Sequence, residues 1–155
     1  MIGKKDSDLK RAVLYFFIYC PLGIICPLIG QYLTSIGFNG TQVGIITSLG
    51  TGTAVLAGLF WGKIYANSHK KRTILSAMCL SAAFFGLMTT STYNFILYAL
   101  LYSCMYFFQG PVHGLSDAFV ISKSTNFSAI RAVGAFGYAA AVFVAGKYAD
   151  AHGLT

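Results

Sequence analysis

Charged residues are absent from three long stretches of this 155-residue chain. No Asp, Glu, Lys or Arg occurs in residues 12–62, 73–116 or 132–146, which contain 51, 44 and 15 residues. A helix needs about 20 apolar residues to cross a bilayer, so these stretches hold roughly two, two and one crossings. The sequence therefore predicts an all-α integral membrane protein with about five transmembrane helices.

The composition agrees with this fold class and removes several others. Hydrophobic residues make up 56% of the chain and charged residues only 10%, whereas soluble domains contain about 25% charged residues. These values exclude a secreted disulfide scaffold, a disordered tail and a conventional cytosolic enzyme. A channel, a transporter subunit and a membrane-embedded enzyme remain open.

Basic residues indicate how the helices are oriented. The formal net charge is +7, and ten of the eleven basic residues fall in three clusters. The clusters are Lys4, Lys5, Lys10 and Arg11; Lys63, Lys70, Lys71 and Arg72; and Lys123 and Arg131. With five crossings all three lie on one side, which the positive-inside rule makes cytoplasmic. We therefore expect a multi-pass protein of the inner cell membrane with a cytoplasmic N-terminus, and no nucleic-acid partner.

The same pattern predicts the domain organisation. Residues 1–11 form a cytoplasmic segment, and residues 12–155 form a partial N-terminal transmembrane bundle. The expected spans cover about residues 12–33, 43–64, 73–92, 94–120 and 127–149. The four cysteines lie in the apolar stretches, where a free thiol packs as a small hydrophobe. Their spacing fits neither a zinc nor a redox motif, so we expect no metal and no cofactor.

Two charged residues fall where the membrane is expected. Residues 132–146 are too few to cross a bilayer, so the fifth helix must begin near Phe127, which places Arg131 inside the span. Asp117 and Arg131 lie seven residues on either side of Ser124, the centre of the turn between the last two helices. Both therefore lie roughly 10 Å from that turn. We expect them to pair, because an unpaired charge there costs about 2.5–3.5 kcal/mol.

Tyr138 extends this pair into a candidate binding site. It follows Arg131 by seven residues, two turns along the same helix face. A guanidinium beside an aromatic ring suits a polyhydroxylated ligand, since Arg supplies forked donors and the ring stacks on a sugar or base. The alternative is that Asp117 and Arg131 only neutralise each other while Tyr138 packs. His113 lies one turn before Asp117 and is a proton partner for it, or else a structural histidine.

Three segments resemble the major facilitator superfamily, in the branch of lactose permease-like and nucleoside-proton symporters. YFFIYCPLGIICPLIGQYLTSIGFNGTQVGI, residues 15–45, resembles the first helix and external turn of that branch. AGLFWGKIYANSHKKRTIL, residues 57–75, is similar to the signature loop between the second and third helices. DAFVISKSTNFSAIRAVGAFGY, residues 117–138, resembles the fourth-to-fifth helix segment.

The resemblance implies roles for individual residues. Asp117, Arg131 and Tyr138 match the acid, Arg and aromatic positions of the substrate site. The residues that match the cytoplasmic gate motif are Gly58, Gly62, Lys71 and Arg72. The gate acid of the family falls on Ala66 and a late glycine of the motif on His69, so the usual gate-sealing interaction is in doubt.

The function implied is proton symport of a small hydroxylated solute, a sugar or a nucleoside, with the proton as coupling ion. Such transporters use two six-helix bundles with the substrate bound between them. Five spans are fewer than one bundle, so we expect a fragment, a truncated reading frame or part of a split assembly that does not transport alone. Its partners would be the solute, the bilayer and the missing C-terminal helices or a complementary half. The alternative is a small membrane interaction or scaffold protein; an enzyme is not expected, because paired acids and a Ser/His/Asp set are absent from the spans.

Overall fold

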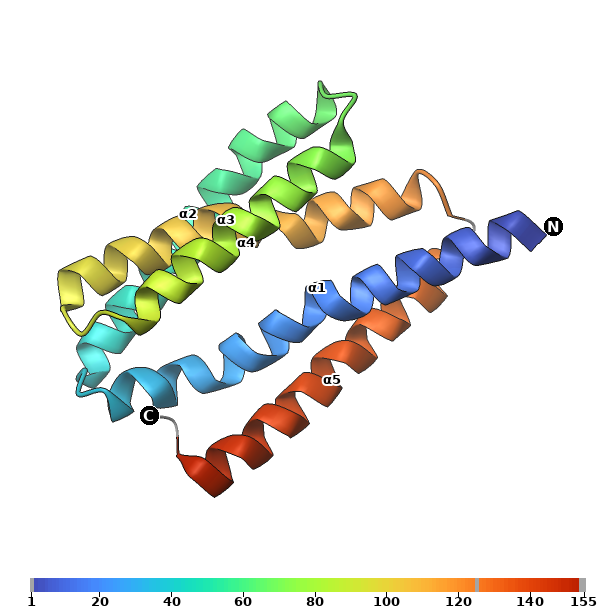
Figure 1. Cartoon of the computed structure of the whole chain (residues 1–155). Coiled ribbons are helices and arrows are strands. Elements are labelled where there is room, and N and C mark those ends of the chain that lie inside the picture. Colours follow the sequence, from blue (N-terminus) through green and yellow to red (C-terminus); the bar gives the residue numbers. More distant parts are fainter. Residues whose placement is uncertain (1, 125, 154–155) are drawn as a thin grey trace. The chain divides into compact units, whose positions relative to one another are not determined.

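The computed structural model describes residues 2–124 and 126–153, which form five α-helices (Figure 1). The helices are α1 (Ile2–Ser35), α2 (Gly40–Ala66), α3 (Lys71–Thr90), α4 (Phe95–Ile121) and α5 (Phe127–His152). Each is long and apolar enough to cross a membrane. The predicted all-α class with five spans is confirmed. Met1, Thr125, Leu154 and Thr155, which fall in the predicted N-terminal segment, the α4–α5 connection and the end of the bundle, lie outside the described residues.

Most helix limits follow from local sequence. Gly37 adopts a φ of +99°, which only glycine takes without strain, and the helical conformation of α1 ends before it. Asn39 then caps α2: its side chain accepts a hydrogen bond from the Gln42 amide, and the Gln42 side chain accepts one from the Asn39 amide. This reciprocal capping box satisfies two amides that a helix start would leave without partners.

One helix is longer than the span expected from its charge-free stretch. α1 begins at Ile2 instead of near residue 12 and continues through Pro21 and Pro27. Charged residues mark where the apolar span ends, but the helix can continue beyond them. Its backbone groups form the same intrahelical hydrogen bonds in water as in the membrane. Within this first part, Arg11 forms an ion pair with Asp8 one turn earlier.

The chain divides into two compact units. The terminal unit contains residues Met1–Gly37 and Val120–Thr155, and the central unit contains Phe38–Phe119. The division into residues 1–11 and 12–155 made from charge alone stays a prediction.

In the terminal unit α1 and α5 run side by side in the same direction (Figure 1). Small residues allow this contact. A Cβ added to Gly23 of α1 would lie 2.5 Å from the Tyr138 carbonyl oxygen, and one added to Gly137 of α5 would lie 2.7 Å from the Phe16 carbonyl oxygen. Gly134 accommodates the Tyr19 ring in the same way. Without water to drive association, such close backbone contact is how membrane helices attract one another.

In the central unit α3 and α4 pack through apolar and aromatic side chains. Leu75, Met78 and Ala82 are buried at helical spacing on α3, and the Phe85 and Phe108 rings stack with centroids 5.8 Å apart. α2 approaches α4 where Gly50 faces the Tyr102 ring. A Cβ added to Gly44, Gly52 or Gly58 of α2 would meet no atom of the described residues within 4 Å, so of these four glycines Gly50 alone makes a close helix contact there.

Candidate substrate-binding site

Arg131 lies in the second turn of α5. The helix begins at Phe127, as the span length predicted, and this start places Arg131 inside the candidate span Phe127–Ala151. Its side chain is exposed, and its guanidinium carbon lies 5.9 Å from the centre of the Phe127 ring. The cation therefore packs on an aromatic ring one turn earlier in the helix.

Tyr138 follows two turns later on the same helix. Its side chain is half-buried, and its backbone carbonyl stands against Gly23 of α1. The close approach at Gly23 fixes the height of this part of α5 against α1. Tyr138 is thus positioned by backbone packing, and Arg131 by its contact with Phe127.

Asp117 and His113 occupy the other unit, on α4. They are one turn apart and both are half-buried, and the Asp117 carboxylate acts electrostatically on the His113 imidazole. Asp117 and Arg131 belong to different units, so their pairing across the hairpin stays a prediction. The proton exchange between His113 and Asp117 also stays a prediction.

Ser116, next to Asp117, was not anticipated. It is 1% exposed, and within the described part of the chain its hydroxyl oxygen has no hydrogen-bond partner. Such a group in an apolar interior is costly. A single serine inside a hydrophobic stretch gives no sequence signal of this kind.

The four residues of the expected gate motif lie at the end of α2 and the start of α3. Gly58 and Gly62 have no atom within 4 Å of an added Cβ among the described residues. Lys71 Nζ lies 5.3 Å from the centre of the Tyr65 ring, and Arg72 Cζ lies 5.9 Å from that of Phe119. Ala66 ends α2 in place of the acid. A gate role for these residues stays a prediction.

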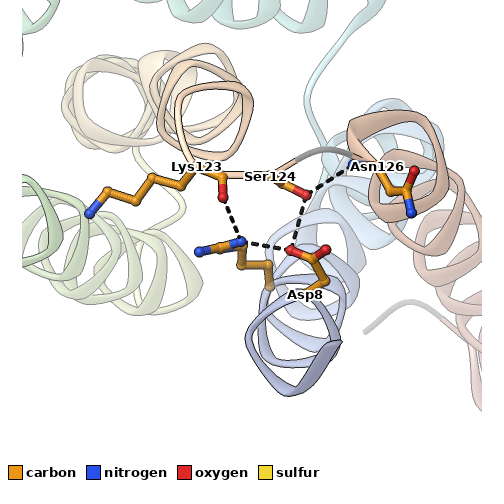
Figure 2. Close-up of polar contacts among 5 residues, drawn as sticks. Asp8, Lys123, Ser124 and Asn126 are labelled. Carbon is orange, nitrogen blue, oxygen red and sulfur yellow. Dashed lines mark hydrogen bonds and ion pairs between the residues drawn. The ribbon is translucent and has the colours of Figure 1, made fainter. Parts of the chain in front are cut away.

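A polar cluster that the sequence did not reveal joins α1 to the α4–α5 loop (Figure 2). Arg11 Nη1 donates to Asp8 Oδ1 at 2.6 Å and to the Lys123 carbonyl at 3.0 Å. Ser124 Oγ donates to the same Asp8 oxygen at 3.0 Å, and the Asn126 amide donates to Ser124 Oγ at 3.3 Å. We call these residues the Asp8 cluster. Asp8 and Ser124 are 116 residues apart in the chain, so no local spacing predicts the contact between them.

Comparison with known proteins identifies the family. The MFS_1 like family matches residues 9–154. "Uncharacterized transporter YwbF" of Bacillus subtilis (strain 168) is 30% identical over 138 residues, which cover 86% of this chain and 35% of the relative. "Maltose permease" of Geobacillus stearothermophilus is 29% identical over 143 residues, which cover 89% of this chain and 36% of the relative. No solved structure matches.

The chain spans about a third of the length of both curated relatives. The match with the family covers α1 from residue 9 onward and the whole of α2 to α5. It confirms the resemblance noted from the three segments, and it places the protein among membrane transporters and not among enzymes. This chain belongs to the MFS_1 like family.

Proposed function

We propose that this chain is part of a symporter that moves a small hydroxylated solute, a sugar or a nucleoside, together with protons across the cell membrane. Family membership supports transport. The relative named maltose permease supports a sugar over a nucleoside. The clustering of basic residues supports a cytoplasmic N-terminus.

The observation that carries the proposal is an exposed guanidinium inside an apolar span. Arg131 is exposed on α5 inside an apolar span, where the cost of a charge rises to about 2.5–3.5 kcal/mol at the bilayer centre. Helices retain such a residue where it lines a solute path. Arg131 would donate to two hydroxyls of the solute, Tyr138 would stack on its ring, and Asp117 would accept from a further hydroxyl. His113 and Asp117 would share the coupled proton.

The remaining parts of the mechanism follow from the family. Substrate binds between two bundles that rock against each other in such transporters. We propose that Gly58, Gly62, Lys71 and Arg72 belong to the cytoplasmic gate, and that transport requires helices beyond the five described here, supplied by the rest of a longer chain or by a complementary subunit.

Uptake of radiolabelled maltose, lactose and uridine tests the proposal. Cells would express this chain alone or together with any coding continuation downstream of Thr155. We expect protonophore-sensitive uptake only with the continuation. Uptake by the chain alone would overturn the two-bundle requirement, and uptake by neither would favour the interaction-protein alternative.

Substitution of Arg131 tests the site within the transport-competent form. Arg131→Ala removes charge-assisted hydrogen bonds that contribute about 1.5–3 kcal/mol, so uptake at low solute concentration should fall about 10- to 100-fold. Arg131→Lys keeps the positive charge but loses the paired donors of the guanidinium, so uptake should fall less than in Arg131→Ala. Lys147→Ala, an exposed cation near the other end of α5, is the matched control and should leave uptake unchanged. Unchanged uptake by Arg131→Ala would refute the site.

A further inference from the structure

Four cations surround the connection between α2 and α3. They are Lys63, Lys70, Lys71 and Arg72, which we call the basic loop patch. The central unit contains one carboxylate in its sequence, Asp117. Within the described residues none of the four cations lies at ion-pair distance from a carboxylate. The patch therefore carries four positive charges that the central unit does not neutralise.

Aromatic rings hold two of these charges at the helix ends. The Lys71 ammonium lies over the Tyr65 ring and the Arg72 guanidinium over the Phe119 ring. Tyr65 itself is 4% exposed in the last turns of α2. Tyrosines at this position in a span are typical of the boundary between hydrocarbon and headgroups. Because the patch lies where the candidate spans Gly40–Ala66 and Lys71–Thr90 meet their connection, we expect it at headgroup level.

The start of α3 adds to the positive potential. A helix N-terminus carries roughly half a positive charge, which acids in the first turn usually offset. α3 has no acid in its first turn, and the Lys70 side chain at its N-cap makes no capping hydrogen bond. Lys70, Lys71 and Arg72 repel one another and this dipole. An anion placed among them would relieve both repulsions.

Apolar surface beside the patch indicates what kind of anion fits. Leu59 and Phe60 on the last part of α2 are 75% and 53% exposed, and Lys63 lies about one helical turn further along the same helix. A soluble phosphate would contact only the cations. A phospholipid would contact both the cations and the exposed apolar side chains, because its phosphate binds the former while its acyl chains cover the latter.

We propose that the basic loop patch binds the headgroup of an anionic phospholipid in the leaflet that the α2–α3 connection faces. This proposal does not depend on the solute or on transport. A basic residue near an anionic membrane surface contributes about a fivefold preference for binding, so three of them contribute on the order of 100-fold.

Native mass spectrometry of the detergent-purified chain tests this site. Phosphatidylglycerol and phosphatidylcholine with identical acyl chains would be titrated, and the apparent Kd of each adduct measured. The patch variant carries Lys63→Gln, Lys70→Gln and Arg72→Gln. The control variant carries Lys10→Gln, Lys123→Gln and Lys147→Gln, and it loses the same number of positive charges as the patch variant. Far-UV circular dichroism establishes that both variants keep their helices.

We expect phosphatidylglycerol to bind more tightly than phosphatidylcholine, and the patch variant to lose most of this preference, on the order of 100-fold. The control variant should keep it. Equal binding of the two lipids by the unchanged chain would overturn the proposal, as would equal losses in both variants. Displacement of phosphatidylglycerol by millimolar glycerol phosphate would assign the patch to a soluble anion and also overturn it.

Discussion

Replacing Gly23 with alanine should separate α1 from α5. The added Cβ would stand 2.5 Å from the Tyr138 carbonyl oxygen and 3.2 Å from the Ala141 Cβ, whereas ordinary contact begins at 3.4 Å. Because the nearer atom belongs to the backbone of α5, no side-chain rotation can relieve the clash. The two helices must move apart locally by about 0.9 Å.

The energetic consequence can be placed on a scale. Overpacking of a well-packed contact typically costs about 1–3 kcal/mol. If this cost falls on the closed α1–α5 pair, the population of separated helices rises about 5- to 150-fold. The higher helix propensity of alanine acts equally on α1 in the packed and the separated state, so it does not change this ratio.

Cys20 reports the separation directly. Its thiol donates to the Gly137 carbonyl at 3.5 Å and is half-buried in the α1–α5 contact. In a background with Cys26→Ala, Cys79→Ala and Cys104→Ala, the maleimide labelling rate of Cys20 should rise by this factor in Gly23→Ala. Gly30→Ala is the control, because it adds the same methyl group to α1 in open space. Equal labelling rates in the two variants would refute the packing argument.

Two further predictions concern other contacts. Asp8→Asn removes the charge that Arg11 and Ser124 approach in the Asp8 cluster, so amide hydrogen exchange at residues 122–124 and 126 should accelerate about fivefold, equivalent to about 1 kcal/mol. Asp150→Asn, at an exposed position, should leave the exchange unchanged. Equal exchange rates in the two variants would mean that the cluster does not hold the loop. Gly50→Ala adds a Cβ 2.6 Å from the Tyr102 ring and should lower the Tm in detergent. Gly52→Ala is the control, because its added Cβ meets no described atom within 4 Å. Equal Tm values in the two variants would show that the ring moves aside freely.

The helices of this protein were largely predictable because the bilayer imposes a length on apolar segments. The last two helices illustrate this point. Their expected limits of about 94–120 and 127–149 compare with Phe95–Ile121 and Phe127–His152 in the structure. The start of α5 was predictable because the 15 uncharged residues before Lys147 are too few to span a membrane, so the helix had to begin before Arg131.

Contacts between helices were less predictable. Gly50 and Gly52 look alike in the sequence, yet one faces an aromatic ring and the other open space. No sequence pattern indicated that Asp8 would accept a hydrogen bond from Ser124, 116 residues away. Periodicity states which residues share a helix face, but the partner of that face depends on tertiary packing that no local pattern encodes.

The packing of α1 on α5 sets a problem for biosynthesis. Cys20 and its partner Gly137 are 117 residues apart, and ribosomes add about 5–20 residues per second. After its synthesis α1 must therefore wait roughly 6 to 23 seconds for the surface that covers Gly23. During that interval the face of α1 around Gly23 is open to lipids, to the insertion machinery and to other nascent helices. A chaperone or insertase that shields this face would therefore act before α5 has been made.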